Sequence, residues 1–244
     1  MTKLFDFNQV LTNIPELLTY LPITLELALL AMLMGLVLGL FLAIIKIKEI
    51  PILKQIAAVF VSMVRGTPVL VQLYIVYFGV PMFFKCLNQK YGTNLAVANI
   101  PGFLYAVLAL GLNSSAFSAE MIRSALMSVG RGQVEAAYAL GMTYGQALRR
   151  IILPEAMTVA LPTIGNSLIS AIKGTSLAFT CAVVEITAQG KIIGGRNYRY
   201  FEVYCSLAII YWLVTIVIEQ ILKFAERKLA IPEQVETFVE HGKE

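Results

Sequence analysis

Hydrophobic residues occur in long runs along this chain, and short polar segments separate them. A helix that crosses a bilayer needs about 20 consecutive, mostly apolar residues. Five runs reach this length, and they cover residues 21–45, 55–84, 101–127, 156–188 and 203–224. The pattern therefore predicts an all-α membrane protein with five transmembrane helices.

The two ends of the chain differ from these runs. Apolar residues between Phe7 and Leu21 recur at helical spacing, which predicts an N-terminal interfacial segment over residues 1–20 with a bend at Pro15. Residues 21–230 are predicted to form the transmembrane domain. Residues 231–244 are polar and acidic, and we expect them to form a cytoplasmic tail.

The composition excludes several classes of protein. Of the 244 residues, 58% are apolar and only 14% are charged, whereas a soluble domain carries about 25% charged residues. The three cysteines lack the spacing of metal ligands, and the single histidine, His241, lies in the polar tail. No GxxxxGK(S/T) motif is present, so we expect neither a P-loop nor a bound cofactor in this chain.

Basic residues indicate the orientation, because cytoplasmic loops of membrane proteins are enriched in lysine and arginine. Ten such residues fall on the side of the first and third connections and the C-terminus, and six fall on the opposite side. We therefore expect the N-terminus outside and the C-terminus in the cytoplasm. The ten are Lys46, Lys48, Lys54, Arg123, Arg131, Arg149, Arg150, Lys223, Arg227 and Lys228; the six are Lys3, Lys85, Lys90, Lys191, Arg196 and Arg199.

The second and fourth runs contain related interruptions. Residues 62–69 and 170–177 both follow the pattern S-x-(V/I)-(R/K)-G-T. Glycine beside proline or serine weakens a helix and frees backbone groups, which survive at membrane depth only where protein or a water-filled cavity covers them. Paired interrupted helices and midplane charges are typical of a substrate path. The candidate path residues here are Arg65, Thr67, Lys173, Thr175 and Ser176.

The third run adds Asn113, Ser115 and Glu120 as further candidate path residues. They do not share one helical face, so they cannot all contact one ligand. Serine in a membrane helix usually bonds to its own backbone or to a neighbouring helix. Glu120 and Arg123 have the i, i+3 spacing of a local ion pair. For Arg65 and Lys173, snorkelling or capping of a broken helix end is the alternative.

The polar segment between the third and fourth runs has its own pattern. Val134, Ala137, Tyr138, Gly141, Met142 and Gly145 follow the spacing of one helical face. The small residues on this face would allow close approach of a partner protein. An amphipathic linker lying on the membrane surface is the alternative.

The order of residues in this segment resembles a known family. Glu135-Ala136-Ala137, three residues, Gly141, nine residues and then Ile151-Ile152-Leu153-Pro154 are similar to the EAA loop of ABC-importer permeases. Residues 65–68 (RGTP) and 173–177 (KGTSL) also resemble signatures of the polar amino-acid permeases, although Gly174 replaces the acidic or amide residue that commonly follows the lysine. The resemblance implies a type I ABC-importer permease fold with a cytoplasmic coupling helix in a loop at residues 131–154.

The resemblance also implies a function and partners. Glu135, Ala136, Ala137, Gly141 and Pro154 would couple the chain to an ATPase. The chain would be the permease of an ATP-driven importer of a polar amino acid in the bacterial cytoplasmic membrane, working by alternating access. General similarity favours L-cystine, with arginine, glutamine or histidine as alternatives. Implied partners are two P-loop ATPase subunits, which bind ATP and Mg, a second permease chain in a homodimer or heterodimer, and an extracytoplasmic solute-binding protein.

Two other classes of protein compete with this interpretation. An ion-coupled secondary amino-acid transporter would also use broken helices and buried charges. An intramembrane enzyme would need a nucleophile with its base or a metal site, and the five runs contain neither histidine nor aspartate. We therefore expect a transporter subunit without enzymatic activity of its own.

Overall fold

The computed structural model describes residues 5–93 and 100–229, and every regular element in these ranges is helical. Residues 231–244, predicted as a tail, lie outside the described residues. In chain order the elements are α1 (Phe7–Leu18), α2 (Leu21–Ile47), α3 (Leu53–Gly66), α4 (Val69–Tyr91), α5 (Gly102–Met127), α6 (Arg131–Ala139), α7 (Tyr144–Ala147), the π-helix η1 (Leu148–Ile152), α8 (Leu153–Gly174), the 3-10 helix η2 (Thr175–Cys181), α9 (Ile186–Asn197) and α10 (Tyr200–Leu229).

The described residues contain five helices long and apolar enough to cross a membrane. Three of them, α2, α5 and α10, agree with the predicted spans within a few residues. The prediction of one span over residues 55–84 is wrong, because the chain breaks after Gly66 and only α4 is long enough to cross. The fourth span is also shifted: it begins at Tyr144 and ends at Cys181, and residues 186–188 belong to α9.

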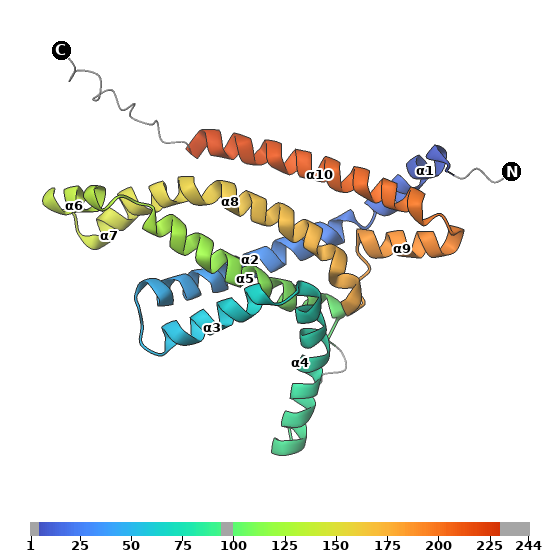
Figure 1. Ribbon diagram of the computed structural model, residues 1–244, viewed down its shortest axis with the longest axis horizontal. Coiled ribbons are helices and arrows are strands. Elements are labelled where there is room, and N and C mark those ends of the chain that lie inside the picture. The colour runs from blue at the N-terminus through green and yellow to red at the C-terminus, as the bar shows by residue number, and fades with distance from the viewer. Residues whose placement is uncertain (1–4, 94–99, 230–244) are drawn as a thin grey trace, which may run out of the picture.

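Helices α2 and α5 form the centre of the molecule and approach each other closely (Figure 1). Small residues make this approach possible: a Cβ atom added at Gly39 would lie 2.6 Å from the Cβ of Ser118, and one at Gly35 would collide with Ser114. Each helix thus presents two small residues four positions apart, the spacing that membrane helices use for close packing. Helix α8 packs against both.

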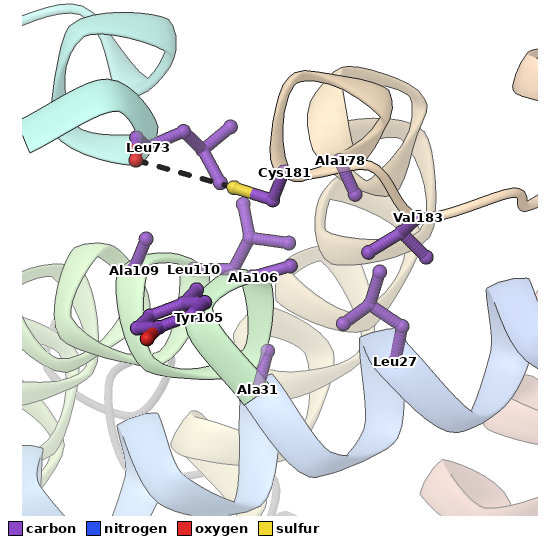
Figure 2. Close-up of a cluster of buried hydrophobic side chains, with 10 residues drawn as sticks. All are labelled: Leu27, Ala31, Leu73, Tyr105, Ala106, Ala109, Leu110, Ala178, Cys181 and Val183. Carbon is purple, nitrogen blue, oxygen red and sulfur yellow. Dashed lines mark hydrogen bonds between the residues drawn. The ribbon is translucent and has the colours of Figure 1, made fainter. Parts of the chain in front are cut away.

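A buried cluster joins the two interrupted spans (Figure 2). Leu73 comes from the first turns of α4 and Cys181 from the end of η2, and both lie on α5 beside Ala106. The Cys181 sulfur lies 4.0 Å from the Leu73 carbonyl oxygen. Because these side chains are almost inaccessible to solvent, the start of α4 and the 3-10 segment are held in one place relative to α5.

The two ends of the molecule carry different short helices. Helices α6 and α7 lie at one end, which we call the hairpin end, and α1 and α9 lie at the other (Figure 1). Helix α1 runs through Pro15 and buries Val10 and Leu17 against α9 and α10. The Ser206 hydroxyl of α10 donates to the Val10 carbonyl at 2.8 Å. Phe7 and Leu11 of α1 stay exposed.

Candidate functional site

The first interruption separates two helices completely. Helix α3 ends at Gly66, and Thr67 and Pro68 adopt extended backbone conformations before α4 begins at Val69. Proline has no N–H to donate and disfavours the helical conformation at the preceding residue, so the sequence Thr67-Pro68 ends α3. Helix α4 then leaves in a different direction from α3 (Figure 1).

Gln72 supplies the hydrogen bonds that the broken helix has lost. Its side-chain amide nitrogen donates to the carbonyl oxygens of Val64 at 2.8 Å and Thr67 at 3.1 Å. The amide of Asn113 on α5 donates in turn to the side-chain oxygen of Gln72 at 3.0 Å. Thus Asn113, a predicted path residue, stabilises the break. Gln72 was not among the predicted site residues, although a single glutamine one turn after a break in an apolar run is a usable signal.

The charge of Arg65 remains without an acidic partner among the described residues. The side chain is exposed, and its guanidinium carbon lies 5.6 Å from the centre of the Phe117 ring on α5, in a cation–π contact. Thr67 is exposed as well, and its hydroxyl donates to the Met63 carbonyl at 2.9 Å. The Phe117 ring therefore positions the Arg65 side chain but leaves its positive charge without a balancing negative charge from any described residue.

The second interruption keeps the chain helical. Helix α8 ends at Gly174, and the next seven residues continue as the 3-10 helix η2. The buried Thr175 hydroxyl donates to the Ile172 carbonyl at 2.7 Å, and the Ser176 hydroxyl donates to the Lys173 carbonyl at 2.7 Å. Both hydroxyls therefore satisfy carbonyls of the last turn of α8. Lys173 itself is exposed, with no ion pair to any acid in residues 5–93 and 100–229.

Glu120 pairs with two cations, near the point where α2 and α5 end. It contacts Lys46 of α2 in a close ion pair, and its other oxygen accepts from Arg123 at 3.2 Å. The local pair with Arg123 is thus present, and the contact with Lys46 is one that sequence reasoning missed. Glu120 and Arg123 also line a cavity of about 470 Å³ between α5 and α8, together with Thr163 of α8.

Ser115 lies close to this charged group in sequence but on another face of α5. It is fully buried, and its hydroxyl donates to the Leu112 carbonyl of its own helix at 2.7 Å. This is the backbone-bonded arrangement that we expected for serines in this helix. The predicted path residues thus divide into exposed or cavity-lining side chains (Arg65, Glu120 and Lys173) and groups that bond to backbone or to Gln72.

The polar segment at residues 131–147 forms a hairpin of two short helices. Helix α6 ends at Ala139, Gly141 turns the chain with φ at +78°, and α7 begins after Thr143. The Thr143 hydroxyl and the Gln146 side chain cap each other's backbone in a capping box. The predicted continuous helical face from Val134 to Gly145 is therefore wrong, because a left-handed turn at Gly141 divides it.

The hairpin presents an exposed surface at its turn. Leu140 is 79% exposed and Tyr144 is 64% exposed. Glu135 and Ala136 are exposed on α6, whereas Ala137 is buried. Pro154, the last residue of the EAA pattern, is exposed in the first turn of α8. Exposed apolar side chains beside a rigid turn are suited to contact with another protein.

A buried carboxyl group lies at the opposite end of the molecule. Glu185 is fully buried, caps the first turn of α9 and accepts from the Ala188 N–H at 2.8 Å. The hydroxyls of Thr24 on α2 and Tyr211 on α10 both lie 3.4 Å from its second oxygen. Burial raises the pKa of the Glu185 carboxyl. Glu185 therefore connects α2, α9 and α10.

Comparisons with known proteins give a consistent result. The family of binding-protein-dependent transport system inner membrane components matches residues 35–231. The L-cystine transport system permease protein TcyL of Bacillus subtilis (strain 168) is 40% identical over 229 residues, which cover 94% of this chain and 93% of the relative. The glutamine transport system permease protein GlnP of Escherichia coli (strain K12) is 35% identical over 227 residues, covering 93% and 99% of the two chains.

Solved structures share the same arrangement of helices. A chain from the crystal structure of an amino acid ABC transporter with histidines has 37% sequence identity and a TM-score of 0.77, over 93% of this chain and 100% of that chain. The MetNI methionine ABC transporter in an inward-facing conformation has a TM-score of 0.68 over 88% of this chain and 96% of that chain. At 19% identity, the second likeness concerns the fold alone.

Proposed function

This chain belongs to the family of binding-protein-dependent transport system inner membrane components, and from this premise we propose that it moves a polar amino acid, with L-cystine favoured, across the bacterial cytoplasmic membrane by alternating access. It is the permease subunit of an amino-acid ABC importer, and ATP hydrolysis belongs to a separate subunit. The substrate, the copy numbers and the transport steps below are our proposal.

The observation that carries this proposal is the exposed hairpin between α5 and α8. Its turn presents Leu140 and Tyr144, and it is continuous with the two helices that line the charged cavity. We assign it to the cytoplasmic side, with the N-terminus outside. A P-loop ATPase docked there would move α5 and α8 together when the ATPase dimer closes, because the capped turn transmits displacement without unfolding.

The stoichiometry follows the two-fold pattern that the sequence resemblance implies. Two copies of this chain, or this chain with a near-identical partner, would enclose the path. Two ATPase subunits would bind the hairpins and supply ATP and Mg. An extracytoplasmic solute-binding protein would deliver the amino acid at the end that carries α9. ATPase and permease partners are consistent with the ABC transporters among the structural relatives.

Charges along the path favour a ligand with carboxylate groups. Arg65 and Lys173 are exposed and have no acidic partner among the described residues, whereas Glu120 is already paired with Lys46 and Arg123. The positive charges of Arg65 and Lys173 are therefore unbalanced within the described residues, whereas the negative charge of Glu120 is balanced by its partners. This arrangement attracts carboxylates more strongly than ammonium groups. Cystine carries two carboxylates and fits this balance. Asn113, Thr67, Thr175 and Ser176 would shape the path by holding the helix breaks, and Ser115 would act only within α5.

Uptake into vesicles tests the substrate and the energy source together. The permease, its ATPase and its binding protein would be reconstituted, and uptake would be measured for cystine, arginine, glutamine and histidine. We expect ATP-dependent uptake with cystine preferred. Uptake that is driven by an ion gradient without the ATPase would contradict the importer mechanism and favour a secondary transporter. Preference for another amino acid would overturn only the choice of cystine.

Gly141→Asp tests the docking role of the hairpin. A side chain at φ +78° costs about 1–2 kcal/mol, so the turn between α6 and α7 should open. We expect at least a tenfold loss of ATPase co-purification, with membrane insertion unchanged. Gly145→Asp is the matched control, because Gly145 lies in α7 and open space surrounds it. Equal losses from both variants would show that charge, and not the turn, weakens docking.

A further inference from the structure

An apolar groove lies on the α2 side of the contact between α5 and α8. It has a volume of about 320 Å³. Leu36, Val37 and Leu40 come from α2, Leu126 from α5, and Leu153 and Met157 from α8. Val37 and Met157 are 56% and 43% exposed, so the groove is open along one side. No charged side chain lines it.

The groove extends toward the hairpin end of the molecule. Leu126 is the residue before the last one of α5, and Leu153 is the first residue of α8. Leu40 lies seven residues before the end of α2, which corresponds to about 10 Å along the helix. All three helices therefore bring the groove to the membrane surface that carries the hairpin.

Two arginines lie where the groove reaches this surface. Arg149 and Arg150 belong to the π-helix that leads into α8, and both are exposed. Arg149 precedes Leu153 by four residues, close to one turn, so it lies on the same helical face as the groove lining. Neither arginine forms an ion pair with an acid in the part of the chain that the structure describes. The nearest acid in sequence, Glu155, accepts from Gln133.

We propose that the groove binds one acyl chain of an anionic phospholipid whose phosphate is held by Arg149 and Arg150. Arginine presents a planar set of donors that matches phosphate geometry. The groove itself is uncharged and ends beside two arginines that form no ion pair with the described residues, which matches a phospholipid with an apolar chain next to an anionic headgroup. This complementarity of charge favours a lipid over a helix from a second copy of the chain.

Such a lipid would lie beside α5 and α8, the helices that we propose to move together with the hairpin. Leu153 and Met157 belong to α8, Leu126 belongs to α5, and Leu36 and Leu40 belong to the neighbouring helix α2. A lipid bound among these helices would contact α5 and α8, the two helices that carry the hairpin, and also α2 beside them. The proposal depends only on the membrane location of the chain and is independent of the amino acid transported.

Fluorescence quenching by brominated lipids tests the site in the full chain. Trp212, the only tryptophan, is 65% exposed on α10 and reports general lipid contact. A second protein with Trp212→Phe and Met157→Trp moves the reporter into the groove. Both would be reconstituted in vesicles that mix phosphatidylcholine with phosphatidylglycerol, with either lipid brominated. We expect a preference for phosphatidylglycerol of about 25-fold at position 157 and a weak preference at position 212, since each of the two arginines should strengthen anionic lipid binding about fivefold.

Matched charge variants identify the headgroup site. Arg149→Gln and Arg150→Gln should each reduce the preference at position 157 by about fivefold, while Arg131→Gln on the hairpin should leave it unchanged. Equal losses from all three variants would show only general surface attraction and would overturn the proposal. Equal preferences for phosphatidylglycerol at positions 157 and 212 would also overturn the proposal. Absence of quenching at position 157 by either lipid would assign the groove to another protein chain.

Discussion

The two interrupted spans begin from nearly the same sequence and end in different structures. Residues 62–69 and 170–177 share serine, a branched residue, a basic residue, glycine and threonine at equivalent positions. The first becomes two helices that diverge at Thr67 and Pro68, and the second remains helical and changes from α to 3-10 geometry after Gly174. Proline in the first copy and serine in the second account for the difference.

The two breaks also satisfy their backbone groups in different ways. The first relies on Gln72, whose side chain bonds the Val64 and Thr67 carbonyls and is held by Asn113 from α5. The second uses hydroxyls of the break itself, with Thr175 bonded to the Ile172 carbonyl. A full break thus needs partners from outside the motif, whereas a change of helix type does not. We expect the first break to be more sensitive to distant substitutions.

The largest effect should come from Ser176→Pro, which makes the second copy like the first. The proline ring would clash with the Ile172 carbonyl, which already accepts from Thr175, and would cost about 3 kcal/mol or more. We expect α8 and η2 to separate and uptake to be lost. Denaturant titration in mixed micelles measures the free energy of unfolding. Native stability in this variant would show that the serine does not maintain the helix.

Gln72→Leu should have the next largest effect, because it leaves two carbonyl oxygens of the first break without a side-chain partner. Val64 is buried whereas Thr67 is exposed. One buried unsatisfied group costs about 1–3 kcal/mol, so we expect the free energy of unfolding to fall by that amount with a parallel loss of uptake. Gln55→Leu on the exposed face of α3 is the matched control and should be nearly neutral. Equal stability of the two variants would refute the role of Gln72.

Pro68→Ser should have the smallest effect on stability, because Gln72 can still bond both carbonyls. Its effect should appear in geometry instead. Spin labels at Gln55 and Phe83, both exposed, report the relation of α3 to α4. A continuous helix would place these positions about 42 Å apart, and we expect the distance to lengthen toward that value as the helices align. An unchanged distance would mean that packing, and not proline, sets the direction of α4.

The charged residues show how far local spacing could predict the site. The pair of Glu120 with Arg123 follows from their i, i+3 positions and is present. The contact of Glu120 with Lys46, the Arg65–Phe117 contact and the Gln72–Asn113 bond join residues 41 or more positions apart. No periodicity in the chain encodes such pairs, because they depend on how α2, α3, α4 and α5 are placed relative to one another.

The sequence alone determined the helical class, the number of spans, the positions of three of them, the two interruptions and the EAA segment, because hydropathy, glycine and proline act over neighbouring residues. The sequence could not decide whether each interruption becomes a full break between two helices or a change from α to 3-10 geometry. It also could not show that Gly141 divides the hairpin, since its left-handed conformation appears only in the folded turn. These outcomes depend on which distant groups satisfy each exposed carbonyl, and only the packed helices decide that.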